Sequence, residues 1–126
     1  MPPVIKIDES WVWRVLASYL PSDPTVWDPS SIPAAVARHA SDVRMVPEQP
    51  EHDHAWRAAA LLHTLTVCPP LESPMNEFFA MSTTYAYLSL APDKPTVDRD
   101  LLADLVEAAQ RGASVHDIAA QLREHT

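Results

Sequence analysis

Two apolar stretches separated by a pair of prolines constrain the fold of this chain most. The first stretch covers residues 58–67 and ends at Cys68-Pro69-Pro70. Proline lacks the amide donor that a helix interior needs, so a helix over the first stretch stops there. Ser73 is suited to cap a second helix, with Pro74 at its first helical position, where the missing N–H leaves nothing unpaired. The pattern therefore predicts two apolar helices joined by a proline-rich loop.

Residues 74–90 carry apolar or small side chains over much of a helical surface. One face at the spacing i, i+3 and i+4 is made by Phe78, Met81, Thr84, Tyr85 and Leu88, with Phe79, Tyr87 and Leu90 close beside it. A helix that is apolar on so much of its surface belongs in the interior. We therefore predict an all-α fold, a compact bundle of about six helices around this central hydrophobic helix. A chain of 126 residues is expected to form a single domain over residues 1–126.

Capping residues and prolines predict the remaining helices. Ser114, followed three residues later by Asp117, resembles a capping box, and Gly112 suits a left-handed helix stop. The expected segments are a helix over 9–20 after Asp8, a short helix over 34–40, an irregular loop over 41–51, a helix that begins near 51–53 and runs into the first apolar stretch, a helix over 99–110 after Asp98, and a last helix after Ser114.

Charge and composition exclude several classes of partner. The formal net charge is −8, whereas nucleic-acid binding needs clustered lysine and arginine, so we expect no nucleic-acid partner. Residues 58–93 contain no lysine or arginine and the chain has one glycine, which argues against a triphosphate site. One cysteine, no signal peptide and no long apolar span suggest a cytoplasmic protein without a membrane partner. We expect no cofactor.

Polar residues gather where the second apolar helix should begin. Glu72, Ser73 and Asn76 lie there, and free amides at a helix N-terminus favour anions or polar ligands. Capping alone explains Ser73 and accounts for Asn76 as well. Phe78, with the other aromatic residues, is a candidate for lining a hydrophobic pocket, although such residues are more often core. We take Glu72, Ser73, Asn76 and Phe78 as candidate ligand-binding residues.

The candidate catalytic groups are His63, Cys68, Glu72 and Tyr85. A lone histidine on an apolar helix, such as His63, is more often a hydrogen-bonded core residue. Cys68 follows a helix C-terminus, where the dipole disfavours a thiolate, so a buried and inert thiol is the simpler expectation. The pair His52 and His54 points about 200° apart on a helix, so we predict no metal site.

The run AAALLHTLTVCPPLESPMNEFFAMSTTYAYLSL resembles the central helix, loop and helix of the Fic/Doc family, whose members move AMP or a phosphate from a nucleotide to a protein. In that family the loop carries a histidine, an aromatic, an acidic and a small residue, an asparagine, and basic residues that end in an arginine. Here Asn76 matches the asparagine. The other positions differ: Pro69 or Pro70 replaces the histidine, Leu71 or Glu72 the aromatic residue, Ser73 or Pro74 the acidic residue, and Glu77 and Phe78 the two basic residues.

The resemblance implies a kept scaffold with a degenerate active-site motif. In the family the histidine acts as general base and the arginine holds phosphates, and neither role has a candidate here. Two functions remain open. The first is a catalytically degenerate pseudoenzyme that binds a protein partner as a regulator or subunit. The second is an enzyme that has turned the cleft into an apolar pocket for a small hydrophobic metabolite, for example in a biosynthetic pathway. An exposed aromatic patch would favour the first, and a deep apolar cavity the second.

Overall fold

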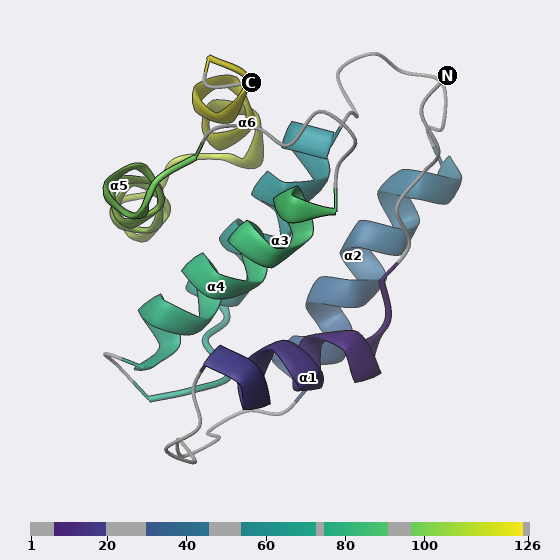
Figure 1. Cartoon of the computed structure of the whole chain (residues 1–126). Helices are drawn as coiled ribbons and strands as arrows, with labels where there is room; N and C mark the ends of the chain where they lie inside the picture. The colour runs from purple at the N-terminus through teal and green to yellow at the C-terminus, as the bar shows by residue number, and fades with distance from the viewer. Residues whose placement is uncertain (1–6, 20–29, 46–53, 73–74, 91–96, 125–126) are drawn as a thin grey trace.

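The computed structural model describes residues 7–19, 30–45, 54–72, 75–90 and 97–124, without the side chains of 39–45. Within these ranges the chain is all-α and forms six helices, which confirms the predicted fold class. In chain order they are α1 (Glu9–Tyr19), α2 (Ser31–Met45), α3 (His54–Val67), α4 (Met75–Ser89), α5 (Arg99–Gln110) and α6 (Val115–Arg123). Figure 1 shows α1 lying across the ends of α2 and α4, and α5 and α6 packed on another side of α3.

The central helix is α3, whereas the sequence pattern pointed to residues 74–90. Ten of the fourteen residues of α3 are buried, and the helix packs against α2, α4, α5 and α6. The alanines of Ala58–Ala60 are fully buried. Such small side chains let neighbouring helices approach closely on several sides, which the larger side chains of α4 do not allow.

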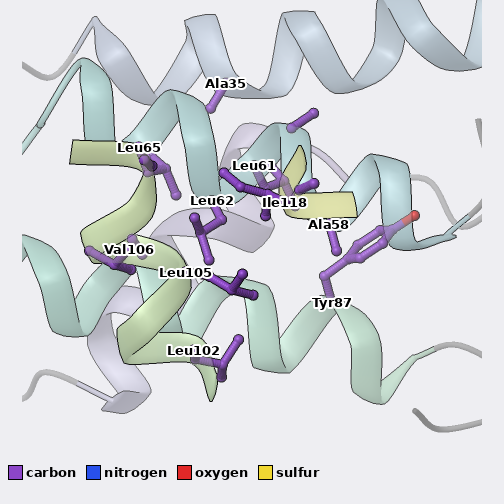
Figure 2. Packing of buried hydrophobic residues seen from close by; sticks show 14 of the residues in the cluster. Ala35, Ala58, Leu61, Leu62, Leu65, Tyr87, Leu102, Leu105, Val106 and Ile118 are labelled. Carbon is purple, nitrogen blue, oxygen red and sulfur yellow. The ribbon is translucent and has the colours of Figure 1, made fainter. Parts of the chain in front are cut away.

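The core is built where α5 and α6 cover α3. Figure 2 shows Leu61, Leu62 and Leu65 of α3 near Leu105 of α5 and Ile118 of α6, all of them buried. Fully burying one such leucine stabilises a fold by about 1.5–3 kcal/mol. These contacts join segments far apart in the sequence, so they fix the arrangement of the helices as well as their stability.

The predicted apolar face of α4 is buried only in part, since Thr84 and Leu88 of that face are buried but its two aromatic residues are not. Phe79, Thr83 and Tyr87 are fully buried, whereas Phe78 is 40% and Tyr85 46% exposed. Apolar side chains lie on both sides of this helix, so the spacing of apolar residues alone does not say which side meets the core. One side of α4 packs on α3, and the other remains available at the surface.

Helix α2 is longer than predicted. It runs from Ser31 to Met45, whereas the sequence suggested a helix over 34–40 followed by a loop over 41–51. Residues 41–45 contain neither proline nor glycine, so nothing in them interrupts helical hydrogen bonding. Residues 46–51 lie outside the described ranges, as do Ser73 and Pro74 at the predicted start of α4.

The predicted signals at the other helix ends are confirmed. The Asp8 carboxylate accepts from the Trp11 amide at 2.8 Å, and Asp98 accepts from the Leu101 amide at 2.8 Å. Ser114 forms a capping box at the start of α6, and Gly112 has a φ of 103°.

Among the described residues, none of the helices is both long and apolar enough to traverse a bilayer.

Candidate functional site

The exposed side of α4 forms one wall of a shallow groove of about 240 Å³, here named the aromatic groove. Two candidate residues, Phe78 and Tyr85, lie in it together. The lining residues are Tyr19 of α1, Phe78, Met81, Ser82 and Tyr85 of α4, and Val97, Arg99 and Leu102 at the start of α5. The groove therefore lies where α1 meets the consecutive helices α4 and α5.

Helical spacing places the α4 residues of the groove on one side. Phe78, Met81, Ser82 and Tyr85 are three or four positions apart, so they lie on the same face. Because this face points away from α3, its large side chains stay accessible. Tyr19, the last residue of α1, is 50% exposed and extends the aromatic surface. Three exposed aromatic residues thus share one concave region.

Arg99 supplies the positive charge of the groove. Its guanidinium carbon lies 5.7 Å from the centre of the Phe78 ring, a cation–π distance. The exposed Asp98 and Asp100 flank it in the chain, and an Asp98 oxygen caps α5. No carboxylate, imidazole or thiol is among the described residues that line the groove. The groove offers aromatic surface, one cation and hydroxyl groups, which suit binding better than proton transfer at neutral pH.

Asn76, a candidate ligand residue, connects the loop to α3 instead of lining the groove. It is 2% exposed, its Nδ2 donates to the Leu65 carbonyl at 2.9 Å, and its Oδ1 accepts from the Leu71 amide at 3.3 Å. Both ends of its side-chain amide are thus used within the chain. Glu72 is exposed in the same loop, and Ser73 lies outside the described ranges.

His63 joins three parts of the molecule. Its Nδ1 lies 3.2 Å from Nη1 of Arg38 in α2, which also donates to Thr64 Oγ1 at 3.2 Å. Burial, together with the Arg38 charge, lowers the pKa of His63 below 6.5, and a hydrogen bond to the Ala113 backbone opposes the change. A neutral ring accepts the Arg38 hydrogen bond at Nδ1.

Cys68 is exposed, which corrects the expectation of a buried thiol. It directly follows the last residue of α3, and its amide donates to the Thr64 carbonyl at 2.9 Å. Neither Cys68 nor His63 lines the aromatic groove.

Several groove residues were not predicted from the sequence. Tyr19 and Arg99 lie about 60 and 20 positions from Phe78, and only the packing of α1 and α5 against α4 brings them near it. The sequence offered one signal for the groove. Helix α4 has apolar residues on opposite faces, and one helix cannot bury both faces against a single neighbour. Elsewhere, the described residues contain no group of three or more histidine, cysteine or acidic side chains arranged to hold a metal; His52 lies outside those ranges.

No model of a known protein family matches the sequence, and no curated protein matches it significantly.

Proposed function

We propose that this chain is a catalytically degenerate Fic/Doc-like protein that acts as a protein-binding regulator or subunit through the aromatic groove. The observation that carries the proposal is the gathering of Tyr19, Phe78 and Tyr85 in one groove, each at least 40% exposed. Aromatic residues and arginine dominate the energetics of protein interfaces, because they combine a large apolar surface with a polar tip.

The size of the groove also favours a protein partner. Its volume of about 240 Å³ is below the roughly 300–1,000 Å³ typical of small-molecule sites. The groove admits one or two apolar side chains that project from a larger partner. Small-molecule chemistry would in addition need an acid or base, and the described lining residues offer none at neutral pH.

The charge of the chain indicates the chemistry of the partner. The net charge is −8, and the exposed Asp98 and Asp100 lie beside the groove residue Arg99. A segment with an apolar anchor for the groove and basic residues around it would match both features. We therefore propose a basic, amphipathic segment of another protein as the partner.

Native mass spectrometry of the tagged protein, purified gently from its source cells, tests the proposal. We expect a second polypeptide in fixed ratio with the wild type, whose binding segment is basic and amphipathic. Phe78→Ser and Tyr85→Ser should each abolish this complex. Val67→Ser is the matched control, because Val67 is 52% exposed and does not line the groove. A complex that survives both groove substitutions, or a bound small molecule in place of a polypeptide, would contradict the proposal.

The loss of family chemistry is tested separately. The wild-type protein is incubated with labelled ATP and with candidate protein targets. We expect no transfer of AMP or phosphate to any target, because the loop has proline and Phe78 where the family has its histidine and arginine. The opposite result is labelling by the wild type that disappears in Asn76→Ala while that variant keeps its helical circular-dichroism spectrum. Such a result would mean that the chain has kept the family activity.

A further inference from the structure

A second groove, of about 300 Å³, lies between α5 and α6 and is here named the α5–α6 groove. Along α5 it is lined from Leu101 to Ala108, which is about two turns or 10 Å of helix. Its other wall is α6, from Asp117 to Gln121. The two helices contact each other less than each contacts α3, so space remains between them. Because it shares no lining residue with the aromatic groove, the α5–α6 groove is a separate surface.

Hydrogen bonds in the connection between α5 and α6 fix the shape of the groove. The Ala113 amide donates to the Ala108 carbonyl at 2.9 Å, and the Gly112 amide donates to the Ala109 carbonyl at 3.1 Å. With Gly112 at a φ of 103°, these bonds form the Schellman ending of a helix. The capping box of Ser114 then holds the start of α6. A groove that is formed in advance loses little conformational entropy when a ligand binds.

The floor of the groove is apolar and its rim is acidic. Leu105 and Ile118 in the floor are 3% and 1% exposed, whereas Asp104 of α5 and Asp117 of α6 are exposed. Asp117 accepts a hydrogen bond from the Ser114 amide at 3.2 Å, which leaves its negative charge in place. Among the described residues, none forms a hydrogen bond or ion pair with the Asp104 side chain, and no lysine, arginine or histidine lines the groove. Two carboxylates therefore flank an apolar floor without a cation in the lining.

We propose that the α5–α6 groove binds a short helical segment of a second protein, in which an apolar side chain is flanked by lysine or arginine. The apolar side chain covers the floor, and the flanking cations pair with Asp104 and Asp117. An elongated groove between two helices suits a helical segment, which presents apolar anchors along one face. A second copy of this chain is disfavoured, because its net charge of −8 repels the acidic rim. The proposal does not depend on the aromatic groove or on the proposed function.

Fluorescence anisotropy of a labelled peptide tests this proposal on the full chain. The probe is a helical peptide about 14 residues long, with leucines at the spacing i, i+3, i+4 and i+7 and lysines elsewhere. We expect saturable binding that weakens as sodium chloride is added, because exposed charge pairs are screened by salt. One control peptide has serine in place of every leucine, and another has glutamate in place of every lysine. Neither control should bind measurably at the concentrations that saturate the probe.

Two pairs of variants locate the binding site on α5. Ala108→Leu fills the groove and should raise the Kd about tenfold or more, since it displaces an apolar anchor from the floor. Asp104→Asn should raise the Kd about two- to fivefold, the usual size of an exposed ion pair. The matched controls are Ala103→Leu and Asp100→Asn, at exposed positions of α5 that line neither groove. Both controls should bind like the wild type, and thermal unfolding checks that all four variants are folded.

Several results would overturn the proposal. One is no binding of the probe, and another is equal binding of the serine control, which would mean that charge alone attracts the peptide. A Kd that rises in Phe78→Ser but not in Ala108→Leu would place the peptide in the aromatic groove. A dimer of the chain alone that dissociates in Ala108→Leu would mean that a second copy occupies the α5–α6 groove. The proposed function fails separately, through a native complex that survives the aromatic-groove substitutions.

Discussion

At the scale of the residue, Asn76 shows how a residue predicted to bind a ligand can serve the fold. Its side chain satisfies the Leu65 carbonyl and the Leu71 amide, both of which belong to fully buried residues. The side-chain amide of Asn76 therefore connects the loop that follows α3 to the helix itself. The sequence predicted that Asn76 would lie at this junction, but capping and ligand binding both fitted the pattern. Only the packing of the loop on α3 reveals the partners of the amide.

We predict that Asn76→Ala destabilises the protein by about 2–4 kcal/mol, because it leaves a buried carbonyl and a buried amide without partners. The free energy of unfolding in urea measures the loss. Glu72→Ala, an exposed change in the same loop, should alter it by less than about 0.5 kcal/mol. Similar values for the two variants would mean that the hydrogen bonds of Asn76 do not support the loop.

At the scale of the element, α4 combines a core face with a surface face, and both are apolar. The capped helices α5 and α6 were predictable because their signals are local: Asp98, Gly112 and Ser114 act within a turn of the helix ends. The orientation of α4 was not, because it depends on which of two apolar faces meets α3. The exposed face became the aromatic groove only through contacts with α1 and α5.

Two neighbouring residues of α4 should therefore behave in opposite ways. Phe79 is fully buried, so Phe79→Ala should lower the free energy of unfolding by about 3–5 kcal/mol. Phe78 is 40% exposed and contacts Arg99, so Phe78→Ala should lower it by about 1 kcal/mol or less, the size of an exposed cation–π contact. Urea unfolding of both variants provides the comparison. A larger loss for Phe78→Ala than for Phe79→Ala would mean that Phe78, and not Phe79, lies on the side of α4 that packs on the core.

At the scale of the whole molecule, the parts least accessible to sequence reasoning are those made by several elements at once. The central position of α3 follows from four neighbouring helices, and no local pattern encodes it. The same is true of His63, which the sequence left open between a core residue and a functional one. The structure shows it bound to Arg38 of α2 and to the backbone at Ala113, between α5 and α6. One imidazole thus connects both sides of the bundle to α3.

This connection makes the stability of the whole bundle depend on pH. The pKa of His63 is lowered from 6.5 in the folded chain, so the folded state keeps a neutral ring at pH values where the unfolded chain already binds a proton. The unfolded state then binds more protons, and stability must fall as the pH decreases below about 6.5 towards the folded pKa. Well above 6.5 both states are neutral at this site, and its contribution is constant.

The measurement is urea unfolding at several pH values between about 5 and 8, a range that spans the usual histidine pKa. Carboxylates also titrate at the acidic end, so the useful quantity is the difference in unfolding free energy between wild type and His63→Gln. We expect the advantage of the wild type to shrink as the pH falls below 6.5, because a protonated ring would meet the Arg38 guanidinium and lose its acceptor nitrogen. His116→Gln, which removes an exposed imidazole outside the Arg38 contact, is the control variant. An advantage of wild type over His63→Gln that grew on acidification would mean that the folded state favours the charged imidazole, contrary to the contact with Arg38.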